Sequence, residues 1–107
     1  MPDTTYNGYK NYETWCVNLW LSNDEGTYRH CRALAAECRE QAPEDQRVKD
    51  GIWPEADTPR FLLSDQLKEL VEEQNPLNGQ ATVFSDLLSA ALSEVDWQEV
   101  AEAFLEE

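Results

Sequence analysis

Residues 11–20 read Asn-Tyr-Glu-Thr-Trp-Cys-Val-Asn-Leu-Trp and carry two of the four tryptophans in a chain of 107 residues. Apolar side chains recur here three and four residues apart, the spacing of a helix that buries one face; they are Tyr12, Trp15, Cys16, Leu19 and Trp20. Because large rings bury much area, we expect Trp15 and Trp20 to be largely buried and this helix to lie at the centre of the core. Asn11 precedes the pattern and is the expected N-cap.

Four later segments repeat the helical spacing and are separated by turn-forming residues. Asn23 is the expected cap of the second helix, and Thr58-Pro59 is the expected start of the third. Asp96, with Glu99 three residues later, predicts a capping box at the fifth helix. No alternating segment is long enough for a strand. The sequence therefore predicts a single all-α domain, a compact bundle of four to five helices, over about residues 12–22, 24–41, 58–74, 81–94 and 97–105.

Two segments fall outside this pattern. Residues 1–10 are expected to be an irregular lead-in whose tyrosines fold back onto the bundle. Residues 43–58 are expected to be a long polar loop, with a short helix over residues 44–50. Trp53 interrupts this loop and has two interpretations: it folds down and seals the bundle, or it is an exposed anchor for a partner.

The charge of the chain is unusual and uneven. The sequence has 22 acidic and 8 basic residues, a formal charge of −14. Residues 64–107 alone carry eleven acids and only Lys68, a net charge of −10. Acids three or four residues apart place like charges on one helix face, which costs about 0.2–0.5 kcal/mol per pair. The accumulation is either the solvated surface of a protein from an acidic proteome or an anionic strip for a partner. Four-residue steps along a helix, about 6 Å each, are comparable to the spacing of successive phosphates.

This charge excludes free nucleic acid and anionic membranes as direct partners and favours a basic surface of a host protein or ribonucleoprotein complex. We predict that the partner-binding residues come from the C-terminal acids and the loop tryptophan; they are Asp65, Glu69, Glu72, Glu73, Glu94, Asp96, Glu99, Glu102, Glu106 and Trp53.

Features of enzymes are missing from the sequence. His30 is the only histidine, and four scattered glycines form no phosphate-binding loop, so we expect no catalytic residues and no cofactor. The three cysteines lack metal-ligand spacing, so we expect free thiols and no metal. Met1-Pro2-Asp3 starts no signal peptide and no apolar run could span a membrane, which indicates a cytoplasmic protein. For Glu13 and Thr14 we expect capping or buried hydrogen bonds rather than a polar pocket.

The N-terminal motif resembles that of a group of small acidic proteins from phages, plasmids and other mobile elements. It reads Tyr6-Asn7-Gly8-Tyr9-Lys10-Asn11-Tyr12-Glu13-Thr14-Trp15, followed by Leu19-Trp20 and Asn23-Asp24-Glu25-Gly26. The resemblance implies no activity and no catalytic residues. It implies a genomic setting, in which small acidic proteins often inhibit host defence nucleases or CRISPR complexes, some by imitating DNA.

Two functions of different classes follow. In the first, the protein inhibits a host nucleic-acid-binding defence complex, of anti-CRISPR or anti-restriction type, by occupying its basic groove as a DNA mimic. In the alternative, it is a non-enzymatic adaptor that docks through the aromatic N-terminal half and Trp53, and the charge only keeps it soluble. Salt distinguishes the two, because acidic-to-basic association weakens steeply with ionic strength and apolar docking does not.

Overall fold

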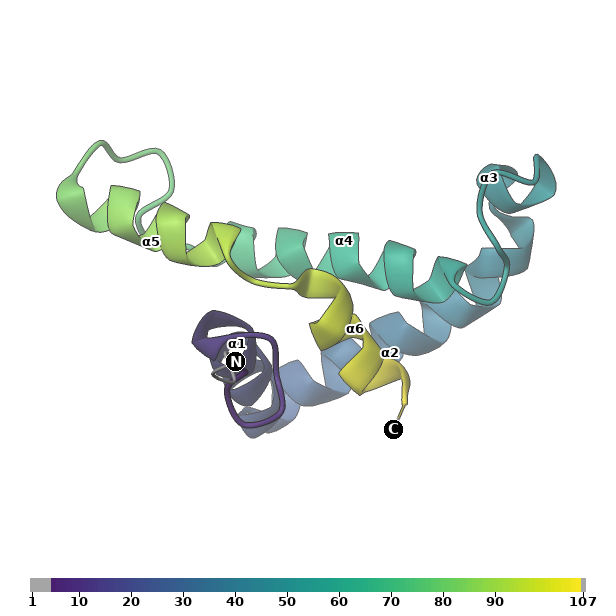
Figure 1. The fold of residues 1–107 in the computed structure, drawn as a ribbon, viewed down its shortest axis with the longest axis horizontal. Helices are drawn as coiled ribbons and strands as arrows, with labels where there is room; N and C mark the ends of the chain where they lie inside the picture. The colour runs from purple at the N-terminus through teal and green to yellow at the C-terminus, as the bar shows by residue number, and fades with distance from the viewer. Residues whose placement is uncertain (1–4, 107) are drawn as a thin grey trace.

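The computed structural model describes residues 5–106, and this part of the chain is all-α (Figure 1). Its five longer helices are α1 (Tyr12–Asn23), α2 (Glu25–Gln41), α4 (Thr58–Glu73), α5 (Val83–Ser93) and α6 (Trp97–Leu105). Two short elements, η1 (Ala42–Glu44) and α3 (Gln46–Lys49), lie in the segment predicted to be a polar loop with a short helix. The predicted all-α bundle of four to five helices is confirmed.

The core lies where α2, α4 and α6 pack together. Small side chains on α2 allow its neighbours to approach closely, and Phe104 of α6 is the largest fully buried side chain. The fully or almost fully buried apolar residues of these three helices are Cys31, Ala35, Cys38, Leu63, Leu67, Val100, Ala101 and Phe104. The core is therefore formed mainly by the second, third and fifth predicted helices.

The expectation that α1 forms the centre of the core is wrong. Trp20 is 71% exposed, and Trp15 and Cys16 are only half-buried. The buried side chains of α1 are Thr14 and Leu21, which lie seven residues apart on one face. The large rings share one side of this helix, as the spacing predicted, but the buried Thr14 and Leu21 lie about half a turn away, on the opposite side. The structure buries the face with the smaller side chains and leaves Trp20 on the surface.

Helix starts agree only in part with the expected caps. Asn11 caps α1 by accepting a hydrogen bond from the Thr14 backbone N–H at 2.9 Å, as predicted. Asn23 is not the cap of α2, because it is the last residue of α1; the side chain of Asp24 accepts the backbone N–H of Thr27 at 3.0 Å instead. The turn between the two helices is therefore a single residue, as predicted, but it is shifted by one position, from Asn23 to Asp24.

The later caps also differ in detail. Thr58 is the first residue of α4, but its hydroxyl donates to the Pro54 carbonyl at 2.8 Å and does not cap the helix. Asp96 caps α6 by accepting the Glu99 backbone N–H at 3.2 Å. The predicted capping box is absent there, since the Glu99 carboxylate accepts the backbone N–H of Lys10 at 2.8 Å. A tertiary contact thus replaces the local one.

The described part of the lead-in, residues 5–10, folds back onto α1. Residues 1–4 lie outside the described range, and so does the expectation that Met1-Pro2-Asp3 starts no signal peptide. Tyr6 and Tyr9 exchange two backbone hydrogen bonds of 2.8 Å around a turn with positive φ at Asn7 and Gly8. The ring of Tyr6 lies 4.9 Å from that of Trp15. This small hairpin turn covers one side of α1.

Within residues 5–106, no helix combines the length and the apolar character needed to cross a membrane. The three cysteines carry free thiols, with Cys31 and Cys38 buried and Cys16 half-buried. No cluster of three or more potential metal ligands occurs in the described part of the chain.

Candidate functional site

The acids of α4 form a row on its solvent side. Asp65, Glu69 and Glu73 follow one another at four-residue steps, and Glu72 lies beside them, so the four share one side of the helix. All four are exposed, and none forms an ion pair within the described residues. The row extends over about 12 Å of helix axis. We call these four residues the α4 acidic row.

The acids around α6 are engaged differently. Asp96 caps the helix, and Glu99 accepts the backbone N–H of Lys10. The carboxylate of Glu102 pairs with Arg60 of α4 at 3.1 Å. These three side chains therefore have roles inside the fold. The other two predicted acids of this region, Glu94 and Glu106, are exposed, and neither forms an ion pair among residues 5–106.

The start of α1 is fastened to the turn between α5 and α6. Thr14 is fully buried; its hydroxyl donates to Asn11 Oδ1 at 2.6 Å and accepts the Asp96 backbone N–H at 2.9 Å. The Asn11 side-chain amide donates to the carbonyl of Glu94 at 2.7 Å. The buried hydrogen-bonding role expected for Thr14 is confirmed. The segment 11–14 thus connects the start of α1 to the α5–α6 turn.

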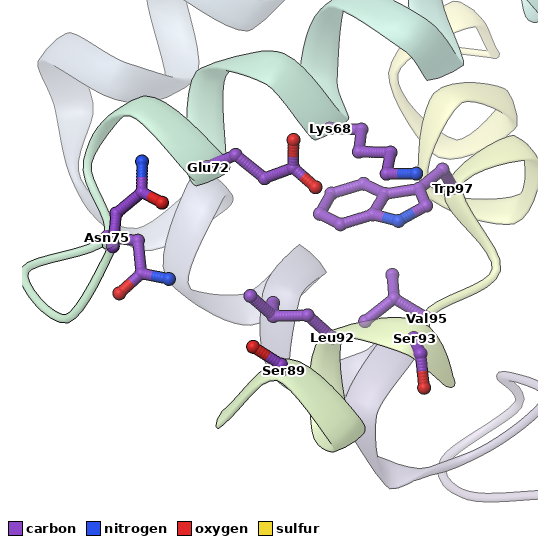
Figure 2. Close-up of a pocket in the computed structure, with 9 residues that line it drawn as sticks. Lys68, Glu72, Asn75, Ser89, Leu92, Ser93, Val95 and Trp97 are labelled. Atoms are coloured by element: carbon purple, nitrogen blue, oxygen red, sulfur yellow. The ribbon is translucent and has the colours of Figure 1, made fainter. Parts of the chain in front are cut away.

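A cavity of about 450 Å³ lies between the C-terminal half of α4 and the α5–α6 turn; its lining consists of Lys68, Glu72, Asn75, Asn78, Ser89, Leu92, Ser93, Val95 and Trp97. Figure 2 shows Lys68 and Glu72 extending from α4 toward the ring of Trp97, with Leu92 and Val95 on the opposite wall. Its amides, hydroxyls, single ammonium and the Glu72 carboxylate offer hydrogen bonds to a polar ligand. Sequence reasoning missed this cavity, because its two walls are far apart in the chain.

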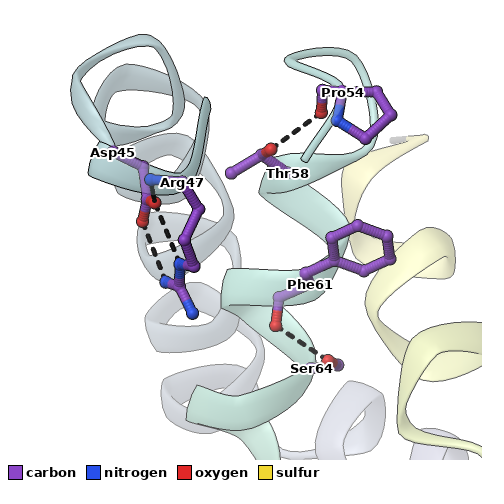
Figure 3. Close-up of polar contacts among 6 residues, drawn as sticks. All are labelled: Asp45, Arg47, Pro54, Thr58, Phe61 and Ser64. Atoms are coloured by element: carbon purple, nitrogen blue, oxygen red, sulfur yellow. Dashed lines mark hydrogen bonds and ion pairs between the residues drawn. The ribbon is translucent and has the colours of Figure 1, made fainter. Parts of the chain in front are cut away.

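Trp53 is half-buried and folds down against α4. The guanidinium carbon of Arg47 lies 3.7 Å from the centre of its ring, and the ring of Phe61 lies 5.0 Å away. Arg47 donates two hydrogen bonds to the Asp45 carboxylate, at 3.0 and 2.9 Å, as Figure 3 shows. Hydrogen bonds from Arg47 hold the pKa of the Asp45 carboxyl below its ordinary value. Of the two interpretations of Trp53, the structure therefore agrees with the one in which it seals the bundle.

A second exposed surface was not among the predicted site residues. Val83, Phe84 and Leu87 of α5 are each about two-thirds exposed, although they belong to the apolar stripe of this helix. A groove of about 600 Å³ lies beside this surface, between Trp20 and the second half of α5, where Leu88 and Leu92 line it. The periodicity of α5 correctly indicated a helix with an apolar face, but it could not indicate that the described part of the chain leaves this face exposed.

Comparison with known proteins identifies the family of this chain and gives no further match. No curated protein and no solved structure matches the chain. A family model matches residues 2–106, nearly the full length, and so includes both the N-terminal motif and the α4 acidic row. The chain belongs to a family of unknown function, DUF7249.

Proposed function

We propose that this protein is a non-catalytic inhibitor from a mobile genetic element, which occupies the basic nucleic-acid groove of a host defence complex of anti-CRISPR or anti-restriction type. The observation that carries the proposal is the α4 acidic row. Its four carboxylates are exposed, lie on one side of one helix and form no ion pair among the described residues. Like charges at this spacing oppose helix formation, which favours a use outside the fold.

The spacing of the row supports imitation of a nucleic acid. Asp65, Glu69 and Glu73 are separated by four-residue steps of about 6 Å, comparable to the spacing of successive phosphates. A basic groove that binds a phosphate backbone would meet a similar series of negative charges. The formal charge of −14 would also steer the protein toward such a groove and raise the association rate.

Contacts inside the fold engage two of the acids of α6, so the proposed binding surface is smaller than the set of residues predicted from the sequence. Glu99 and Glu102 already accept a hydrogen bond and an ion pair from the protein itself. Using them for a partner would break contacts that hold α6 in place. We therefore assign the main role to the α4 acidic row, with Glu94 and Glu106 as peripheral charges.

The resemblance of the N-terminal motif to proteins of phages and plasmids supports the genomic setting, and the host cytoplasm is the proposed site of action. The alternative function, an adaptor that docks through aromatic residues, is favoured by one specific observation. Trp20 and Phe84 are large rings that are 71% and 69% exposed. Trp53 does not support that function, because it packs against the guanidinium of Arg47 and, edge-on, against the ring of Phe61.

A charge-neutralising variant tests the proposal. Glu69→Gln/Glu72→Gln/Glu73→Gln removes three charges of the α4 acidic row with little change in side-chain size. The matched control, Glu37→Gln/Glu40→Gln/Glu55→Gln, removes three exposed charges outside it. The readout is displacement of a labelled DNA duplex from a CRISPR or restriction complex, followed by fluorescence anisotropy.

The expected result is that the wild type and the control displace the duplex and the α4 variant does not. Equal loss in both variants would mean that only the net charge matters. Equal retention would show that the α4 acidic row is not the binding surface, and the assignment would then be wrong.

A further inference from the structure

We propose that the exposed face of α5 is a docking surface for a second copy of this chain, so that the protein forms a two-fold symmetric dimer through α5. This inference does not rest on the proposed function. It starts from a helix that the other residues of the described range, 5–106, leave largely uncovered. In Figure 1 the N-terminal part of α5 projects beyond α1 and α4, and the main helix–helix packing among residues 5–106 involves the other helices.

The exposed side chains of α5 are of the kind that normally fill a core. Phe84 is 69% exposed, and Val83 and Leu87 are each 64% exposed. The helix has only eleven residues, and helices shorter than about 12–15 residues are marginal in water without tertiary packing. A partner that covers this face would remove the exposed apolar area and stabilise the helix at the same time.

A hollow lies beside these projecting side chains. Leu88 and Leu92 of α5 face Trp20 and Val71 across the groove of about 600 Å³. A neighbouring hollow of about 310 Å³ shares Trp20 and Val71 and continues along α1. The two hollows make one continuous apolar surface. The surface thus has a projecting side at the start of α5 and a recessed side at its end.

This combination fits a two-fold interface. In such an interface the same patch is used by both copies, and each contact occurs twice. When two α5 helices pack antiparallel, Phe84 and Leu87 of each copy can enter the groove beside Leu92 and Trp20 of the other. A projecting side and a recessed side on one helix are the elements that a self-complementary patch requires.

The distribution of charge selects a second copy over other occupants. Residues 74–93 contain a single charged residue, Asp86, in a chain with a formal charge of −14. Asp86 is two residues from both Phe84 and Leu88, which turns it away from these two side chains; it lies three residues from Val83, at the edge of the exposed face. Two copies can therefore meet here without bringing their acids together. A basic partner would find no counter-charges on this face, and an anionic membrane would be repelled by the whole chain.

Salt should act on this contact in the opposite direction from docking on a basic groove. Two copies of an acidic chain repel each other at long range, and salt screens that repulsion. The contact itself is apolar and is not weakened by screening. Self-association should therefore become tighter as ionic strength rises, whereas binding of the α4 acidic row to a basic groove should become weaker.

Analytical ultracentrifugation of the full chain tests the dimer without any partner protein. Four proteins are compared at low and high ionic strength: the wild type, two variants of Leu87 (the first is Leu87→Glu) and the control Ile52→Glu. Ile52 is 66% exposed but lies in the segment before α4, away from α5. Circular dichroism checks that the helix content is unchanged, and Leu87→Ser provides a second variant without an added charge.

The expected result is that the wild type and Ile52→Glu sediment as dimers, more so at high salt, and that both Leu87 variants weaken the dimer at least tenfold. A wild type that remains monomeric at all concentrations and salt levels would overturn the proposal, as would a Leu87→Glu variant that dimerises like the wild type. If the α4 variant loses inhibition but still dimerises, that result bears on the proposed function and leaves the dimer proposal unchanged.

Discussion

The side-chain hydroxyl of Thr14 accepts a hydrogen bond from the backbone N–H of Asp96 at 2.9 Å, joining residues that are 82 positions apart in the sequence. The same hydroxyl donates to Asn11 Oδ1 at 2.6 Å. The cap of α1 and the start of α6 therefore share one buried side chain. This contact fixes how the N-terminal hairpin and the α5–α6 turn are placed relative to the core.

Replacing Thr14 by valine should destabilise the fold. Valine has a similar shape but leaves the Asp96 N–H and the Asn11 carbonyl oxygen without this partner inside the protein. An unsatisfied buried polar group costs about 1–3 kcal/mol. Urea denaturation measures the change in the free energy of unfolding. Thr27→Val is the control, because the Thr27 hydroxyl contacts only the nearby Asp24 carboxylate in an exposed turn. Equal losses in the two variants would show that Thr14 has no special role.

Truncation of two aromatic residues to alanine should lower the free energy of unfolding by very different amounts. Phe104 is 1% exposed, so Phe104→Ala should cost about 3–5 kcal/mol of unfolding free energy. Trp20 is 71% exposed, so Trp20→Ala should cost about 0.5 kcal/mol or less. Thermal unfolding of both variants in dilute protein checks this order. A Trp20 variant that loses as much stability as the Phe104 variant would contradict the placement of α1.

The helix boundaries were largely predictable from the sequence, because they depend on neighbouring residues. The second helix was predicted to end at residue 41 and α2 ends at Gln41, and Asn11 is the predicted cap of α1. The sequence could not indicate which side of α1 is exposed. The spacing of Trp15 and Trp20 places them on one side of a helix, but it does not say whether that side faces the core or the solvent. The choice depends on α2, α4 and α6, whose small and medium side chains fill the core without these rings.

The candidate site was predictable in composition but not in its contacts. The acids of α4 lie off the apolar stripe, so their exposure followed from periodicity. The engagement of Glu99 with Lys10 could not be foreseen, because these residues are 89 positions apart. The cavity beside Trp97 and the uncovered face of α5 also depend on how separate helices meet, which a local pattern does not contain.

The three thiols should react at different rates. Burial raises the pKa of Cys31 and of Cys38 to about 11, so both stay protonated and unreactive at neutral pH. Cys16 is half-buried and should be modified first. Thiol titration with Ellman's reagent should therefore detect one fast group in the native protein and three after denaturation. Rapid modification of all three in the native state would contradict the buried positions of Cys31 and Cys38.

The same two thiols should make the fold sensitive to alkali. The pKa of each is higher in the folded protein than the value of about 8.5 for an unfolded thiol. The stabilisation is thus complete below about pH 8.5 and decreases as the pH rises toward 11, since the unfolded state loses its protons first. Urea midpoints measured across this range should fall. A Cys31→Ala/Cys38→Ala variant should show a weaker decrease.

Reversing one charge in the α4 acidic row should stabilise the protein. In Glu69→Lys, the new cation lies three or four residues from Asp65, Glu72 and Glu73, and each such pair is worth about 0.2–0.5 kcal/mol. Glu37→Lys is the control, because Glu40 is the only acid at these spacings from it on α2. Thermal unfolding at low ionic strength should show the larger gain for Glu69→Lys. No difference between the two would mean that the row does not oppose folding.

The salt dependence of binding to a defence complex tests the central claim most directly. The dissociation constant is measured for the wild type and for Glu69→Gln/Glu72→Gln/Glu73→Gln across a series of salt concentrations. If the α4 acidic row occupies a basic groove, the affinity of the wild type falls steeply as salt rises and the variant has a shallower slope. An affinity for the wild type that stays constant or increases with salt, with the variant unchanged, would contradict this account.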